Sequence, residues 1–236
     1  KILDSISYIH SYKKKLTKEF NAEMFLWSDY KKTTFFEKKK SSLSAIALID
    51  IHGEIKDDSG MGFSSETVTY NELEKEIQWA HDSEEIKSVM IRISSPGGSA
   101  LASDQIWAII NDLKKKKPVV VSMGDVAASG GYYIASPATK IFSYKTTLTG
   151  SIGVVSARPS LGNFEKLYGI SFSTITGSDR KNFLNLGERL SEVDKNILQK
   201  MTNSVYDEFL AKVSSGRDLP ISYVRSIAQG RVWSGA

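Results

Sequence analysis

The sequence predicts an α/β fold with layered parallel sheets. Short apolar runs rich in β-branched residues alternate along the chain with segments whose apolar residues recur at helical spacing. Two of these runs lead directly into Gly-rich turns that precede a helix. The chain has 236 residues, of which 41% are hydrophobic and 25% charged. That composition is ordinary for a globular protein, and the length allows one large domain or a domain with an appendage.

The first half of the chain supplies four of the expected elements. No strand is expected in the Lys-rich residues 1–43. A strand over 44–51 ends at Gly53, and a helix follows over 70–81. A strand over 89–93 enters the first Gly-rich turn, and an amphipathic helix over 102–113 ends in a lysine run before Pro118.

The second half repeats the pattern. The expected elements are strand 119–122, helix 129–135, strand 140–143, strand 152–155, helix 160–168 and strand 170–174. A long helix then begins at Ser191, with apolar residues at four-residue steps. Ser191 followed by Asp194 predicts a cap of the capping-box type at its start.

Charge and composition exclude several classes of function. The net charge of +4 comes largely from lysine runs at 13–15, 38–40 and 114–117. We expect these runs to be solvated surface, with contact to anionic lipid headgroups as the less favoured alternative. The sequence has no basic stripe with interleaved aromatic residues, so nucleic-acid binding is not expected. The sequence contains no cysteine, so no disulfide is expected, and it has no cluster of His, Asp and Glu, so no metal site is expected. No cofactor is expected either.

The two Gly-rich turns carry the candidate chemistry. The first is Ser94-Ser95-Pro96-Gly97-Gly98-Ser99, and the second lies within Met123-Gly124-Asp125-Val126-Ala127-Ala128-Ser129-Gly130-Gly131. A serine among small residues at a strand-to-helix turn has room for a substrate carbonyl. The first N–H groups of the helix lack intrahelical partners and can stabilise an oxyanion. Ser129 is therefore the candidate nucleophile.

A serine nucleophile needs a base, and histidine is a poor candidate in this chain. His10, His52 and His81 all precede Ser129, which rules out the α/β-hydrolase order of nucleophile, acid and histidine. We expect His52 and His81 to be surface or cap residues. The remaining base is a lysine, whose ordinary pKa near 10.4 can fall by about 3 to 5 units on burial.

Three motifs give the chain a family resemblance. SSPGGS, GDVAASGGYYIA and Leu148-Thr149-Gly150-Ser151-Ile152-Gly153-Val154 resemble, in order and separation, the signal peptide peptidase A family, peptidase family S49. The resemblance implies a ββα superhelix like that of caseinolytic protease (ClpP) and crotonase. It implies a Ser-Lys dyad with Ser129 as nucleophile, Gly98 and Gly130 as oxyanion donors, and Ser151 as the residue that orients the lysine.

The resemblance leaves two positions open for the lysine. Single-unit members carry a Ser-Gly-x-x-Lys pattern, whereas this chain has Arg180 in that slot and Lys181 one residue later. Residues 1–43 resemble instead the linker or tail of a preceding unit in the tandem form of the family, with 44–236 as a peptidase domain that continues beyond Ala236. In the tandem form the lysine lies in the first half. We favour that form and keep Lys181 as the candidate base within this chain.

The expected function is that of a serine endopeptidase that degrades cleaved signal peptides. The resemblance implies apolar signal-peptide or unfolded peptide substrates, a homo-oligomer, and association with the bacterial inner membrane with the catalytic domain on the periplasmic face. Two alternatives remain: a crotonase-like acyl-CoA enzyme, in which the same N–H groups would stabilise an enolate, and a catalytically silent half that only supports assembly.

Overall fold

The computed structural model describes residues 5–6, 23–26, 44–57, 66–158, 167–169 and 190–235. These fall into two compact units, one of residues 1–153 with 209–236 and one of residues 154–208. Lys181 and the expected strand 170–174 lie outside the described residues, as does most of the expected helix 160–168. The expected α/β class is confirmed.

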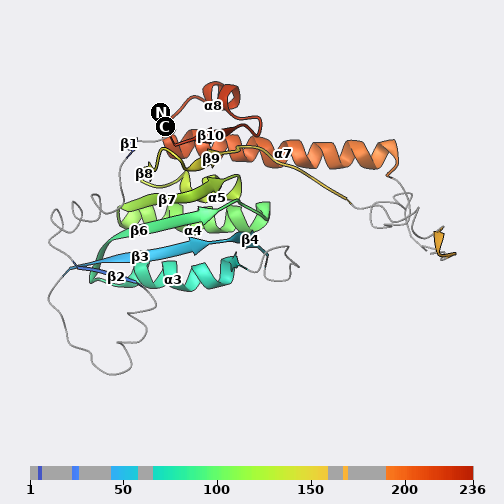
Figure 1. Ribbon diagram of the computed structural model, residues 1–236. Helices are drawn as coiled ribbons and strands as arrows, with labels where there is room; N and C mark the ends of the chain where they lie inside the picture. The colour runs from blue at the N-terminus through green and yellow to red at the C-terminus, as the bar shows by residue number, and fades with distance from the viewer. Residues whose placement is uncertain are drawn as a thin grey trace. The chain divides into compact units, whose positions relative to one another are not determined.

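A mainly parallel sheet forms the centre of the larger unit, with strand order β1-β8-β7-β6-β3-β2 (Figure 1). Its strands are β1 (Ser5–Ile6), β2 (Glu23–Leu26), β3 (Ala45–His52), β6 (Ile86–Ser95), β7 (Val119–Ala128) and β8 (Lys140–Ser143). The expectation of no strand in residues 1–43 was wrong. β1 forms one edge of this strand order, where it pairs with β8, and β2 forms the opposite edge, where it pairs with β3. Edge pairing depends on backbone hydrogen bonds, so it needs no strong apolar alternation in the sequence.

Two amphipathic helices connect the central strands. Helix α3 (Tyr70–Asp82) follows a capping box between Thr69 and Glu72, and α4 (Ala100–Lys116) begins where the Ser99 side chain accepts the N–H of Ala102. Both bury the apolar face that their spacing predicted. The buried residues are Leu73, Ile77 and Ala80 on α3, and Ala102, Ser103, Ile106, Ile110 and Leu113 on α4.

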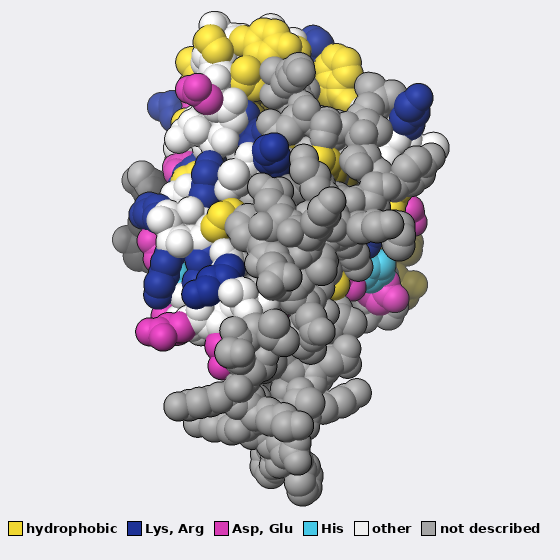
Figure 2. Space-filling model, turned by 90° about the vertical axis from the view of Figure 1, so that its left-hand side faces the viewer, with side chains coloured by type: hydrophobic (Ala, Val, Ile, Leu, Met, Phe, Trp, Pro, Cys, Tyr) yellow, Lys and Arg dark blue, Asp and Glu magenta, His cyan; other side chains and the backbone are white. Residues whose placement is uncertain are grey.

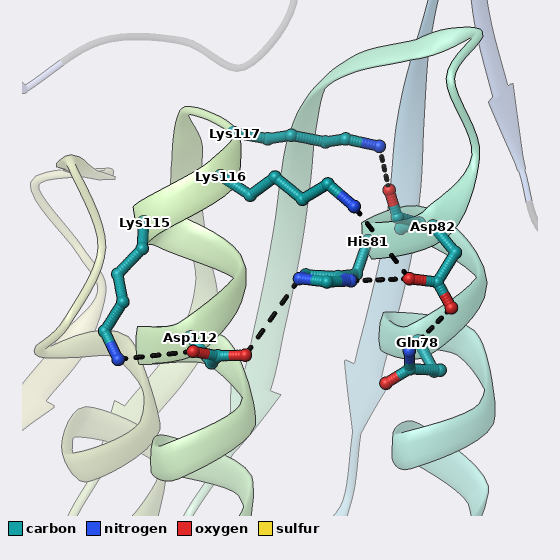
Figure 3. Close-up of polar contacts among 8 residues, drawn as sticks. Gln78, His81, Asp82, Asp112, Lys115, Lys116 and Lys117 are labelled. Carbon is teal, nitrogen blue, oxygen red and sulfur yellow. Dashed lines mark hydrogen bonds and ion pairs between the residues drawn. The ribbon is translucent and has the colours of Figure 1, made fainter.

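The ends of α3 and α4 are joined through polar side chains (Figure 3). The Lys117 ammonium donates 2.6 Å hydrogen bonds to the carbonyl oxygens of Ala80 and Ser83, and the residue is only 8% exposed. Its burial lowers the pKa of Lys117 below the ordinary lysine value. The expectation that the whole lysine run is solvated surface was therefore wrong at Lys117, which satisfies carbonyls at the end of a helix.

Strand β7 changes partner along its length. Residues 120–122 pair with β8, whereas residues 126–128 pair with β9 (Leu148–Gly150). Against β6, the register passes from Ile93 opposite Met123 to Ser95 opposite Ala127, so β7 carries extra residues in a bulge. β9 in turn pairs antiparallel with β10 (Val232–Ser234).

The strand expected over 152–155 was wrong, since the described residues 151–158 contain no strand. The strand lies instead at 148–150, and the backbone then turns through two positive φ angles, 76° at Gly150 and 47° at Ser151. The turn ends the ladder before the apolar run begins, and the Ile152 carbonyl accepts the N–H of Gly230 instead.

The last helices are α7 (Glu192–Arg217) and α8 (Ile221–Ile227). The predicted α7 cap is confirmed: the Ser191 hydroxyl accepts the Asp194 N–H at 3.1 Å and donates to its carboxylate at 2.6 Å. Of the apolar stripe, Phe209 and Val213 are buried, but Val193, Met201 and Val205 are exposed. Among the described residues, no helix combines the length and the apolar character needed to span a bilayer.

Hydrophobic side chains gather at the top of the molecule in Figure 2, at the end that carries α8 and β10 in Figure 1. The exposed apolar residues of these two elements are Ile221, Tyr223, Val232 and Trp233.

Candidate active site

Ser129 lies between the end of β7 and helix α5 (Gly130–Ala135), where the sequence placed the nucleophile. Its backbone has φ 52° and ψ −120°, a conformation that a residue with a Cβ rarely adopts. Such a conformation costs about 1–3 kcal/mol and persists only where the surroundings enforce it. The side chain is half-buried and makes no capping bond to α5. The Ser129 hydroxyl is therefore not occupied in stabilising its own helix.

The Ser-Pro-Gly-Gly turn lies against Ser129. Gly97 is buried with φ 99°, and a Cβ built on it would stand 2.5 Å from the Gly130 nitrogen and 2.9 Å from the Ser129 Cβ. Only glycine allows the two turns to approach so closely. The structure thus brings together the two Gly-rich turns that the sequence singled out.

Gly98 forms a parallel bridge with Ile55, which belongs to the small sheet of β4 (Glu54–Lys56) and β5 (Thr67–Thr69). The Ile55 N–H donates to the Gly97 carbonyl at 2.9 Å, and the Ser99 N–H donates to the Ile55 carbonyl at 2.8 Å. In a parallel ladder, the backbone N–H and carbonyl of Ile55 bond to the residues on either side of its partner Gly98. The N–H of Gly98 itself therefore points away from Ile55.

The direction of the Gly98 N–H suits an oxyanion donor. The Gly98 nitrogen lies 3.3 Å from the position that a Gly130 Cβ would occupy, and Gly98 is exposed. Among the described residues, neither the Gly98 N–H nor the Gly130 N–H donates a hydrogen bond to the backbone. N–H groups left without a described backbone acceptor next to a serine turn are of the kind that stabilises a tetrahedral oxyanion.

Ser151 lies on the other side of Ser129. Gly150 is opposite Ala128 in the β7–β9 register, and its carbonyl accepts the Ser129 N–H at 3.0 Å. Ser151 follows at φ 47°, is half-buried, and donates its own N–H to the Arg231 carbonyl at 2.7 Å. Thr149 adds a side-chain bond to the Ala127 carbonyl at 2.8 Å. The candidate nucleophile and the candidate lysine-orienting serine are thus on neighbouring chain segments.

Among the described residues, no histidine or lysine side chain forms a hydrogen bond with Ser129. His52 is exposed and contacts Glu66 at 2.6 Å, and His81 contacts Asp82 at 2.7 Å in the last turn of α3, as expected of surface or cap residues. Lys117 has a lowered pKa but lies before Val119, at the opposite end of β7 from Ser129. Within the described part of the chain, no group of His, Cys, Asp and Glu is arranged to hold a metal ion.

Sequence reasoning missed two contributors to this geometry. Gly150 accepts the Ser129 N–H, and Ile55 bonds to the residues on either side of Gly98. Gly150 stands in a motif that the sequence displays, so its proximity to Ser129 could have been inferred. Ile55 could not, because nothing in the sequence links it to a turn more than forty residues away.

Comparison with known proteins extends the match to most of the chain. The model of peptidase family S49 matches residues 111–236, and the Clp protease model matches residues 48–148, which fits the ClpP/crotonase-like α/β fold. The chain is 38% identical over 213 residues to the chloroplastic serine protease SPPA of Arabidopsis thaliana, covering 88% of this chain and 32% of that protein.

Bacterial relatives match over similar stretches. Protease 4 of Haemophilus influenzae is 36% identical, covering 81% of this chain and 31% of the relative. The putative signal peptide peptidase SppA of Enterococcus faecium is 30% identical, covering 83% of this chain and 57% of the relative. The chain spans about a third of the length of the first two relatives. From the site geometry, the family models and these identities together, the chain belongs to peptidase family S49.

Proposed function

We propose that the chain carries the nucleophile and oxyanion hole of a serine endopeptidase. The observation that carries the proposal is the close approach of the Gly97-Gly98 turn to the Ser129-Gly130 turn, where neither the Gly98 nor the Gly130 N–H donates to the backbone among the described residues. Ser129 Oγ would attack the scissile carbonyl while a base takes its proton, and the two N–H groups would stabilise the resulting oxyanion. The protonated base would then give this proton to the amide nitrogen, so that the tetrahedral intermediate collapses, releases the amine fragment and leaves an acyl-enzyme, which water would hydrolyse with the same base taking its proton.

The base in this proposal is a neutral lysine of a Ser-Lys dyad, oriented by Ser151. The lack of a histidine beside Ser129 among the described residues supports a lysine. Its source is either Lys181 or a preceding unit of a tandem protein, and we favour the preceding unit because Arg180 fills the slot expected for lysine. Arginine cannot replace it, since its guanidinium stays protonated.

The proposed substrates are apolar signal peptides or unfolded segments in extended conformation. An extended substrate could pair with backbone beside the exposed Gly98, as an added strand. We also propose a bacterial enzyme at the inner membrane, with its catalytic domain on the periplasmic face; the bacterial relatives named Protease 4 and signal peptide peptidase SppA support the proteolytic role. We also propose a homo-oligomer, because the apolar residues exposed on α8 and β10 and along α7 would be covered by neighbouring copies.

The proposal is tested by Ser129→Ala in the complete protein. We expect loss of peptide cleavage and loss of labelling by a serine-directed fluorophosphonate, with the melting temperature retained. Labelling of the wild type at Ser129, located by mass spectrometry of the digested protein, distinguishes a peptidase from a crotonase-like enzyme, which needs no nucleophilic serine. Near-wild-type cleavage by Ser129→Ala would refute the assignment.

A further inference from the structure

The strained Ser129 backbone is continuous with a very short helix. α5 has six residues, and its first complete backbone bond joins the Tyr133 N–H to the Ser129 carbonyl at 2.9 Å. A helix of this length is not stable alone, so its position must be fixed by side chains. All of its residues are buried. Side chains that hold Tyr133 in place therefore also hold the Ser129 carbonyl, to which the Tyr133 N–H donates.

Tyr133 is tied to α4 through its hydroxyl. The Tyr133 Oη donates a 2.8 Å hydrogen bond to the Asp104 carboxylate, and its ring lies 4.5 Å from the ring of Phe209. The acceptor is a charged group, which makes this hydrogen bond stronger than one between neutral partners. Tyr133 is 5% exposed, so water competes little for its hydroxyl.

Lys212 connects the same carboxylate to the indole of Trp107. It lies in the part of α7 that belongs to the larger unit. Its ammonium is 3.2 Å from the Asp104 carboxylate oxygen that accepts the Tyr133 hydroxyl, and 3.8 Å from the centre of the Trp107 ring. The Lys212 side chain is only 20% exposed, against 43% for Asp104. Lys212 thereby restrains two residues of one face of α4.

Trp107 completes a second connection to α5. Its Nε1 donates to the Ser136 hydroxyl at 3.0 Å, and that hydroxyl donates to the Tyr133 carbonyl at 2.8 Å. Tyr133 is therefore held at its side chain by Asp104 and at its carbonyl by Ser136. Both connections start on α4, and Lys212 contacts the α4 residue of each.

We infer that Tyr133, Asp104 and Lys212 form a positioning network that holds α5, and through it Ser129, in the reactive conformation. The inference rests on the proposed function of Ser129. Their effect on Ser129 would pass through the backbone bond between the Tyr133 N–H and the Ser129 carbonyl. Their loss should slow the attack by Ser129 without weakening substrate binding, because small displacements of a nucleophile strongly affect rate.

The test uses Tyr133→Phe in the complete protein, which keeps the ring and removes only the hydroxyl. We expect kcat and the rate of fluorophosphonate labelling to fall about tenfold, with KM unchanged. A hydrogen bond to a charged group commonly contributes a free energy that corresponds to about this factor. In Asp104→Ala, kcat and the labelling rate should fall by a similar factor. In Asp104→Asn they should fall less, because the amide oxygen still accepts the Tyr133 hydroxyl. In Lys212→Met they should fall only about two- to threefold, since the ion pair that is lost is partly exposed.

Two variants serve as matched controls. Tyr70→Phe removes a tyrosine hydroxyl bonded to the Glu74 carboxylate on α3, and Lys195→Met removes an ion pair with Glu192 at 2.7 Å elsewhere on α7. Both should label and cleave at the wild-type rate. A Tyr133→Phe variant that labels at the wild-type rate, or whose loss lies entirely in KM, would overturn the inference while a dead Ser129→Ala variant left the proposed function intact. An active Ser129→Ala variant would overturn both.

Discussion

The Ser129 N–H donates a 3.0 Å hydrogen bond to the Gly150 carbonyl, and this bond joins the nucleophile turn to the segment that leads into Ser151. It extends the β7–β9 ladder by one step beyond Ala128 and Gly150, the last paired residues. The ladder fixes the nitrogen side of Ser129, while the Tyr133 N–H fixes its carbonyl side. Ser129 is thus restrained on both sides, which explains how its backbone can keep a positive φ.

Gly97→Ala should abolish most activity without unfolding the protein. The new Cβ would stand 2.5 Å from the Gly130 nitrogen, so the Ser129 turn or the Gly98 turn must move. A displacement near 1 Å can cost about 10²-fold in rate, and we expect a loss in kcat of at least that order. Steady-state kinetics with a fluorogenic peptide measure the loss.

Gly230→Ala is the control for this substitution. Gly230 also has a positive φ, 70°, but nothing lies within 4 Å of the position that its Cβ would take. It should lose about 1–2 kcal/mol of stability from backbone strain and keep most of its kcat. Equal losses of kcat in the two variants would show that crowding at Gly97 is not the cause.

Lys181→Ala should leave peptide cleavage intact in the complete protein, because we favour a base supplied by a preceding unit. The measurement is kcat/KM across pH 6 to 10, where activity should rise as the catalytic lysine loses its proton. If Lys181→Ala eliminates cleavage while Ser129 remains correctly folded, Lys181 is the base and the tandem assignment fails. Arg180→Ala provides a neighbouring control.

Lys117→Met should destabilise the larger unit. Methionine keeps the length of the buried stem but removes the ammonium that donates to the Ala80 carbonyl, whereas the Ser83 carbonyl keeps the N–H of Ile86 at 3.3 Å. An unsatisfied buried carbonyl costs about 1–3 kcal/mol, which thermal or urea unfolding can resolve. Lys115→Met is the matched control: Lys115 has a 70% exposed side chain and pairs with Asp112 on the surface, so its loss should change stability by less than about 0.5 kcal/mol. Equal destabilisation by both variants would contradict the capping role.

Asp82→Asn should make the protein less sensitive to acid. The hydrogen bond from His81, followed by that from Gln78, holds the pKa of Asp82 below its ordinary value. The folded state therefore favours the carboxylate, and the stabilisation is present above the unfolded value near 3.9 and lost as pH falls through the folded pKa. The urea midpoints of wild type and Asp82→Asn should differ most near pH 6 and converge towards pH 2. Glu85→Gln, at an exposed carboxylate, is the control. A constant difference across this range would refute the linkage.

The sequence predicted the elements whose signals are local. The capping pair of Ser191 and Asp194 fixed the start of α7, and the apolar spacing on α3 and α4 identified their buried faces. Ser129 was identifiable because it stands among small residues at a strand-to-helix turn, and Gly98 because its motif resembles that of family S49; a Gly-Gly pair alone equally predicts a tight turn. The structure brings these two turns together, as the sequence predicted.

Errors arose where a distant partner decided the outcome. Residues Met123–Ala128 contain a glycine and an aspartate, which indicate a turn, yet they continue β7 because β9 supplies a second partner. The run at 152–155 is apolar enough for a strand, but the turn at Ser151 directs its backbone to Gly230. Lys117 lies in a run of lysines that indicates surface, and only the packing of α3 beside α4 shows that its ammonium is enclosed.

The pairing of β9 with β10 has a consequence for the order in which the site is completed during synthesis. The strands β3, β6, β7 and β8 are all translated by residue 143, so the central sheet can assemble early. The support of the Ser129 turn cannot, because β9 pairs with residues 232–234 and the Ser151 N–H bonds to Arg231. A nascent chain would hold its nucleophile in an incompletely supported turn until those residues leave the ribosome. The turn that carries Ser129 is thus completed after the central sheet on which it stands.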